Sequence, residues 1–201
     1  MTPPAVGLMY MTSALSSEDV GAFQNLLDPE GNALEVIEQE EKGIYAGLEW
    51  LLPTAVIVYV GKAYFDGFLK EMGKDHYALL KEGIKGLRAK LFRPGGPEHM
   101  VVGSKGKVQA DRPYSLTFSM LAEGQEGLSF KLLFPNAGAS AECDLAVSAF
   151  LEFLANYHAG RPDAAVIAEM QAIRPVGRTV LLAYEPGLKR LQLVDAMRDT
   201  R

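Results

Sequence analysis

The uncharged run at 50–61 and the amphipathic pattern that follows it form the strongest signal in the chain. Only 12 residues separate Glu49 from Lys62, whereas a membrane-spanning helix needs about 20 apolar residues. β-Branched and aromatic residues dominate 54–60, which favours a strand buried on both faces, with a buried helix as the alternative. We therefore predict a strand in the middle of a sheet.

After Gly61 the hydrophobic residues recur at three- and four-residue spacing, which places them on one side of a long helix. The residues on this side are Phe65, Phe68, Leu69, Met72, His76, Leu79, Leu80, Ile84, Leu87 and Leu91. Four glycines interrupt the pattern, and each costs about 1 kcal/mol of helix stability relative to alanine. We expect a break or kink near Gly73 or Gly83.

The N-terminal region predicts a strand followed by two helices. Residues 6–11 are apolar enough for a first strand, and Ser16, followed by acidic residues, is typical of a helix start. The turn at 28–32 ends that helix. A second helix is expected from Ala33, because Leu34, Ile37, Glu41 and Ile44 follow a helical spacing beside a run of acids.

The second half of the chain changes to a period of two. One side of the segment 114–120 carries Tyr114, Leu116, Phe118 and Met120, and 128–134 repeats the alternation. The two glycines between these segments predict an antiparallel hairpin at 114–134. Its polar side is expected to meet water or a partner. A short strand around 101–108 is expected before it.

Two helices and a second hairpin complete the predicted fold. A helix from Ala141 should end at Gly160, and a shorter one should cover 163–173. Residues 179–194 predict a hairpin whose turn at 185–188 has proline and glycine where a type II turn needs them. The fold class is α+β: one domain with an antiparallel or mixed sheet packed on amphipathic helices, with a possible subdivision at the Gly/Pro-rich connection 93–99.

Composition narrows the function classes. The chain has 201 residues, 48% hydrophobic residues and a net charge of −5, which is typical of a globular protein. This acidity argues against a nucleic-acid partner, although Lys81 to Arg93 is a local basic cluster. The single Cys143 excludes an internal disulfide, and the N-terminus lacks a signal-peptide pattern, so a prokaryote-like cytoplasm is expected.

Three titratable residues are candidates for catalysis. His76 lies on the apolar side of the long helix and Cys143 in the first turn of a helix, where a thiol is activated; His158 lies near a helix end. Each of these residue types is more often structural. No motif for a nucleophile, a dinucleotide or zinc is present, so we expect neither a metal nor a cofactor.

The leading hypothesis is a noncatalytic binding or assembly module, a subunit or adaptor that binds a protein partner or itself. Its expected interface residues are Tyr59, Tyr64, Phe65 and Phe68, because this segment offers more large side chains than one helix face normally buries. One alternative is a small-substrate enzyme, a hydrolase or transferase using His76 or Cys143. The other is peripheral membrane attachment through the apolar run and the basic cluster.

Overall fold

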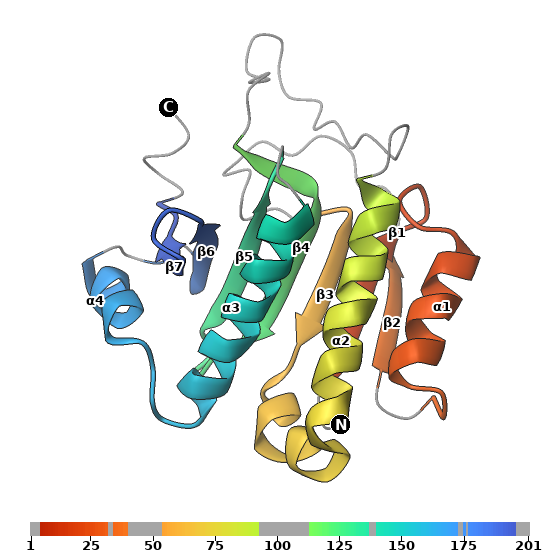
Figure 1. Cartoon of the computed structure of the whole chain (residues 1–201), viewed down its shortest axis with the longest axis horizontal. Helices are drawn as coiled ribbons and strands as arrows, with labels where there is room; N and C mark the ends of the chain where they lie inside the picture. The colour runs from red at the N-terminus through yellow and green to blue at the C-terminus, as the bar shows by residue number, and fades with distance from the viewer. Residues whose placement is uncertain are drawn as a thin grey trace, which may run out of the picture.

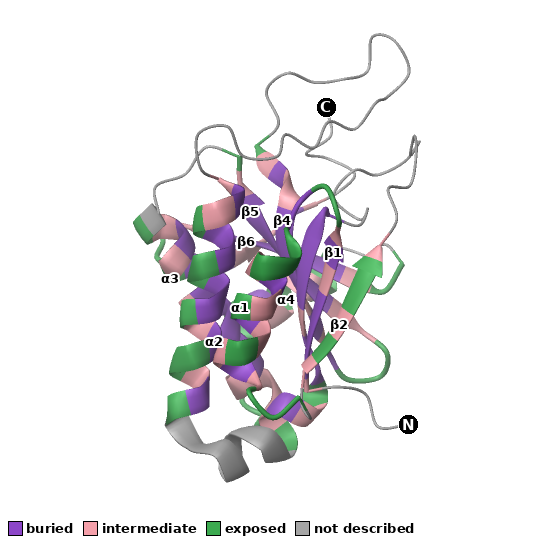
Figure 2. Ribbon diagram, turned by 90° about the vertical axis from the view of Figure 1, so that its right-hand side faces the viewer, coloured by how far each residue is buried: buried purple, intermediate pink, exposed green. Residues whose placement is uncertain are grey.

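The computed structural model describes residues 5–31, 34–39, 54–92, 113–136, 140–172, 175 and 177–195; for 67–74 and 140 it describes the backbone alone. A seven-stranded mixed sheet forms one layer, and the four α-helices cover one of its faces (Figure 1). The turned view shows the helices on one side of the sheet (Figure 2). The predicted α+β class is confirmed.

The elements follow the chain in this order: β1 (Val6–Met11), α1 (Ser17–Leu27), β2 (Leu34–Gln39), β3 (Val56–Val60), the π-helix η2 (Tyr64–Phe68), α2 (Leu69–Leu91), β4 (Tyr114–Glu123), β5 (Ser129–Pro135), α3 (Ser140–His158), α4 (Ala164–Ala172), β6 (Thr179–Glu185) and β7 (Arg190–Leu193). The strand order across the sheet is β2-β1-β3-β4-β5-β6-β7. Both predicted hairpins are present, because β4 pairs antiparallel with β5 and β6 with β7.

Three parallel pairs, each joined by helix, make up most of the sheet: β1-α1-β2, β3-α2-β4 and β5-α3-α4-β6. β1 and β3 are antiparallel, and their crossovers lead to neighbouring strands on opposite sides, β2 and β4. The first two crossovers therefore have the same hand, and Figure 1 shows that it is the usual right hand. β5 runs like β1 but steps the other way with its helices on the same face. The third crossover is therefore left-handed, which is rare.

The main core lies between the sheet and the helices. It is built from alternate residues of the strands, such as Leu8, Val58, Met120 and Leu132, and from the inner sides of all four helices. The predicted central strand is confirmed: β3 lies between β1 and β4, and Val56, Val58 and Val60 are fully buried. A second, smaller cluster on the other face contains Leu133, Leu181, Ala183 and Val194.

The helix predicted from Ala33 is wrong, because 34–39 is the edge strand β2, parallel to β1. Leu34 and Val36 pack against the main core, while Glu35 and Ile37 are exposed. This is a period-two pattern, and the β-branched Val36 and Ile37 favour it. The run of acids had suggested a solvated helix face; of these, Glu35 and Glu38 are exposed residues of the strand.

The long helix is confirmed, and a break near Gly73 or Gly83 is absent, because α2 is continuous over 69–91. The irregularity comes earlier, in the π-helical turn η2. Gly83 serves close packing, because a Cβ atom placed there would lie 2.9 Å from the Phe23 ring of α1. Glycine therefore lets α1 and α2 approach each other.

The side assignment for 114–120 is partly wrong. A register shift in the β4–β5 pairing between Tyr114 and Ser119 moves Tyr114 and Leu116 to the second cluster, while Phe118 and Met120 face the helices. The polar side of this hairpin was expected to meet water or a partner, but part of it is buried. Ser119 is fully buried and its hydroxyl lies 2.6 Å from that of Thr54, and Lys131 is 4% exposed.

The predicted start of α1 and end of α3 are correct, whereas the predicted type of the turn after β6 is not. Ser16 caps α1 in a capping box with Asp19, and Gly160 follows α3 with a positive φ of 72°. In the turn after β6, the positive φ falls on Lys189 and not on Gly187, so the predicted type II turn is wrong. The segments 93–99 and 101–108 lie outside the described residues.

Candidate functional site

His76 is held inside the protein between α1 and α2. Its Nε2 lies 3.0 Å from the carbonyl oxygen of Leu27 and its Nδ1 3.3 Å from the Tyr64 hydroxyl. A carbonyl only accepts, so Nε2 carries the proton, and in a neutral ring Nδ1 accepts from Tyr64. Burial raises the pKa of Tyr64, which keeps its hydroxyl protonated. The imidazole thus ties the start of α2 to the end of α1.

Cys143 lies in the first turn of α3 and is 1% exposed. Burial raises the pKa of its thiol, and the nearby Arg88 guanidinium opposes this shift only in part. The neutral thiol is a weak nucleophile. Neither Cys143 nor His76 lines the two clefts described below.

His158 belongs to a polar cluster at the carboxyl ends of β3 and β4. Its Nε2 donates to the Glu123 carbonyl at 3.0 Å, and its ring stacks on Phe65 with centroids 5.1 Å apart. Its Nδ1 is enclosed and has no hydrogen-bond partner. The Glu123 carboxylate accepts from the Lys62 backbone N–H at 3.0 Å and from the Tyr59 hydroxyl at 3.3 Å. The cluster joins α3 and the start of the long helix to the sheet.

We expect His158 to make stability depend on pH. Burial lowers its pKa below the ordinary value of 6.5. As the pH falls, His158 therefore binds a proton more readily in the unfolded chain than in the folded protein. The free energy of unfolding should then fall as the pH drops from about 7 to about 5. The variant His158→Gln keeps a donor for the Glu123 carbonyl but does not titrate, so its urea-unfolding free energies should fall less over this range. Equal slopes for the two proteins would contradict this role.

The four aromatic residues proposed for an interface lie in different environments. Tyr64 is fully buried, and Phe65 is half-buried against His158. Tyr59 is half-buried; burial, followed by the Glu123 carboxylate, raises its pKa to about 12. The side chain of Phe68 lies outside the described residues. The three described side chains are thus buried or half-buried by other residues of the same molecule.

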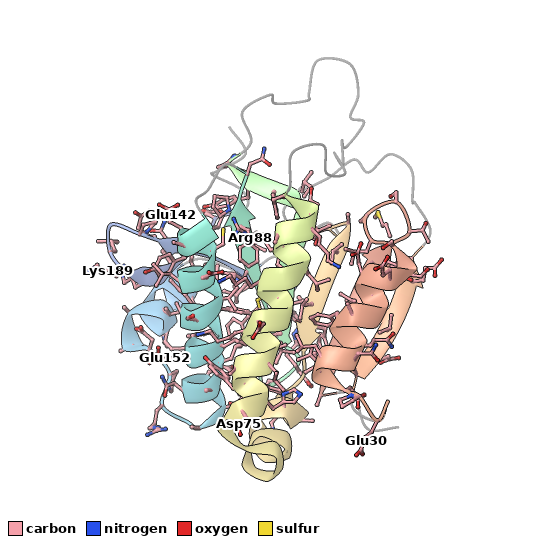
Figure 3. All side chains as sticks on the ribbon, turned by 45° about the vertical axis from the view of Figure 1, so that its right-hand side comes forward. Glu30, Asp75, Arg88, Glu142, Glu152 and Lys189 are labelled. Atoms are coloured by element: carbon pink, nitrogen blue, oxygen red, sulfur yellow. The ribbon has the colours of Figure 1, made fainter. Side chains whose placement is uncertain are left out.

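The basic cluster Lys81 to Arg93 does not form one exposed patch over its described part. Lys90 pairs with Asp19 of α1, and Lys85 with Asp144 of α3 at 3.6 Å. Arg88 is buried against the Phe92 ring between α2 and α3 (Figure 3). These cations therefore help to join α2 to its neighbouring helices.

The two edges of the sheet differ in how their outward backbone N–H groups are bonded. At β7 the Glu169 carboxylate of α4 accepts from the Leu193 backbone N–H at 3.1 Å and pairs with Arg190 at 2.9 Å. At β2 only the first amide is covered, since Leu34 donates to Asp28 at 2.8 Å. By the alternation of a strand, the amides of Val36 and Glu38 point the same way. Within the described ranges, nothing bonds to these two amides, and Figure 2 shows β2 as a mostly exposed ribbon.

Two clefts lie in the helix layer. The first, about 450 Å³ between α2 and α3, includes Lys81, Lys85 and Arg88 among its lining residues. The second, about 460 Å³, lies between α3, α4 and β7, and is lined in part by Glu152, Arg161, Lys189 and Arg190. Sequence reasoning missed both, because the residues come from distant segments. The recurring cations of α2 were the only local signal.

Searches for related proteins add no functional information. No protein-family model matches the chain, and no curated protein or solved structure is significantly similar to it. Among the described residues, no group of histidine, cysteine and acidic side chains is placed to hold a metal ion. In the same part of the chain, no helix has the length and apolar character needed to cross a membrane.

Proposed function

We propose that this protein is a noncatalytic assembly module that associates with a second copy of itself through the edge strand β2. The observation that carries the proposal is the difference between the two edges of the sheet. Glu169 blocks the outward amide of Leu193 at the β7 edge, whereas those of Val36 and Glu38 at the β2 edge have no partner in the described part of the chain. An uncovered row of backbone donors and acceptors is a template for another strand.

The geometry favours an antiparallel pair around a two-fold axis. If the axis is perpendicular to the sheet, the helices of both copies lie on the same side, and residues of the same parity meet. With Ile37 on the axis, Val36 exchanges backbone hydrogen bonds with Glu38 of the second copy. The two Ile37 side chains then meet at a close, non-hydrogen-bonded position.

Side-chain chemistry fits this register. Ile37 is 41% exposed, and is one of four large hydrophobic residues that are exposed in the described part of the chain. Pairing would bury Ile37 against Ile37 of the second copy. Glu35 would face Gln39 of the second copy, so no like charges lie directly opposite each other within 35–39. A pair of six-residue strands buries less surface than a stable dimer normally does, so association should be weak and depend on concentration.

The variant Ile37→Lys tests this proposal, because it places two ammonium groups at the two-fold axis. Light scattering over a wide concentration range should show a mass that rises toward the dimer for the unmodified protein and stays at the monomer for Ile37→Lys. Leu188→Lys is the matched control: Leu188 is 58% exposed in the turn beyond β6, near the blocked edge. It should associate like the unmodified protein. A strict monomer in every case would contradict self-association and leave only a different protein as the partner.

The two alternatives have less geometric support. An enzyme using His76 or Cys143 needs one of them beside a pocket, and both are enclosed. An activity screen with Cys143→Ser and His76→Gln would test this hypothesis. Peripheral membrane attachment needs a continuous basic surface, whereas Lys85 and Lys90 are paired with acids. Strong, salt-sensitive sedimentation with anionic liposomes would support attachment.

A further inference from the structure

We propose that the cleft between α3, α4 and β7 is a binding site for a small organic anion, a molecule with one carboxylate or phosphate group and an apolar body. The site lies at the opposite edge of the sheet from β2, so it is independent of the proposed self-association. Two parts of the chain that are far apart in sequence build it: the segment from α3 through α4, and the β6–β7 turn with the start of β7.

Three cationic side chains converge on this cleft from both of those parts. Arg161 follows the end of α3, Lys189 is the last residue of the β6–β7 turn, and Arg190 is the first residue of β7. Arg161 and Lys189 are exposed, and neither has an ion pair within the described residues. Figure 3 shows Lys189 on the α4 side of α3, the side on which Glu152 also lies. Two free cations beside one concave surface attract an anion.

Arg190 is a fixed part of the wall. Its Nη2 donates to Glu169 at 2.9 Å, which holds the planar guanidinium in place at the edge of β7. Its Nη1 is enclosed and has no hydrogen-bond acceptor in the described structure. Buried N–H groups normally have an acceptor. Arg190 therefore supplies an anchored positive charge, while the exposed side chains of Arg161 and Lys189 contact the anion directly.

The remaining lining limits the kind of anion. Phe153, Val166 and Leu191 are buried apolar residues at the cleft and suit the body of an organic ligand. Glu152 and Asp163 also line it, so the lining itself carries a net charge of only +1, and Glu169, outside the lining, already pairs with Arg190 at 2.9 Å. Asp163 is already engaged as the cap of α4, accepting from the Ala165 backbone N–H at 2.8 Å. A monoanion fits this balance better than a polyphosphate or a nucleic acid.

The test is a titration of the ¹⁵N-labelled full chain at constant ionic strength, followed by amide chemical shifts. Three probes separate the contributions: benzoate carries the anion and an apolar body, inorganic phosphate the anion alone, and benzamide the body alone. Benzoate should shift amides around Asn156, Val166 and Leu191, and should bind more tightly than either other probe. Phosphate binding as tight as that of benzoate would overturn the role of the apolar wall, and equal binding of benzamide would overturn the role of the cations.

Charge-reversal variants locate the effect. Because the side chains of Arg161 and Lys189 make no hydrogen bond or ion pair among the described residues, Arg161→Glu with Lys189→Glu should leave the fold intact and weaken benzoate binding about tenfold or more. Lys85→Glu, in the other cleft, is the matched control and should bind benzoate normally. If the double variant binds as tightly as the unmodified protein, or if the shifts map to Ile84 and Ser148, this site assignment is wrong.

Discussion

Replacing Ile57 by alanine should lower the free energy of unfolding by about 2–5 kcal/mol. Ile57 lies in the middle of β3, opposite Met9 of β1 and Ser119 of β4, and is 6% exposed. Removing its three outer carbons leaves a cavity that two flanking strands prevent from closing. Such a loss is a large share of the roughly 5–15 kcal/mol that keeps a domain folded. Urea unfolding followed by circular dichroism would measure it.

Asp66→Ala is the matched control for that measurement. Asp66 is exposed and pairs with Lys62 one turn earlier, and an exposed ion pair contributes little. Its removal should change the free energy of unfolding by no more than about 0.5 kcal/mol. If both substitutions had similarly small effects, β3 could not be the central buried strand.

Lys131→Met should make the protein more stable at neutral pH, by about 1–3 kcal/mol. Lys131 of β5 is 4% exposed and lies on the helix-free face of the sheet. It is paired with Leu121 of β4 on one side and Leu181 of β6 on the other. Burial lowers the pKa of its ammonium group from 10.5 to about 8. Such a shift corresponds to about 3 kcal/mol by which the folded state disfavours the charged form. Methionine keeps the length and the apolar stem without that cost.

The same shift predicts the pH dependence and its sign. Below pH 8 Lys131 is charged in both states, so the folded protein bears the whole cost. Between pH 8 and about 10.5 the unfolded chain holds a proton that the folded protein has lost, so this residue makes stability rise with pH. The rise should be absent from Lys131→Met. A less stable variant at pH 7 would show that the contacts of the ammonium group outweigh its desolvation.

Local patterns predicted most of the fold, and their failures have physical causes. The run 54–60 was assigned correctly because β-branched residues fill it and no charge interrupts it. Strand β2 was missed because Leu34 and Ile37 also fit a helical spacing, and only pairing with β1 decides between the two periods. The shift inside β4 and the positive φ of Lys189 depend on strand register, which no local pattern determines.

The candidate sites were less predictable than the fold. His76 was found from its place on an apolar helix side, but its two hydrogen-bond partners come from positions 49 and 12 residues away. The cleft cations Arg161 and Lys189 meet only because α4 lies against β7. The open edge at β2 depends on the order of all seven strands. Sites that topology assembles are not visible in local spacing.

Amide hydrogen exchange at the β2 edge tests self-association most directly. If two copies pair around Ile37, the outward amides of Val36 and Glu38 become bonded only in the dimer, so their exchange should slow as the protein concentration rises. The amide of Leu193, which Glu169 already holds, should exchange at one rate throughout. In Ile37→Lys the concentration dependence should disappear. Exchange at Val36 and Glu38 that stays equally fast at every concentration would contradict the proposed pairing.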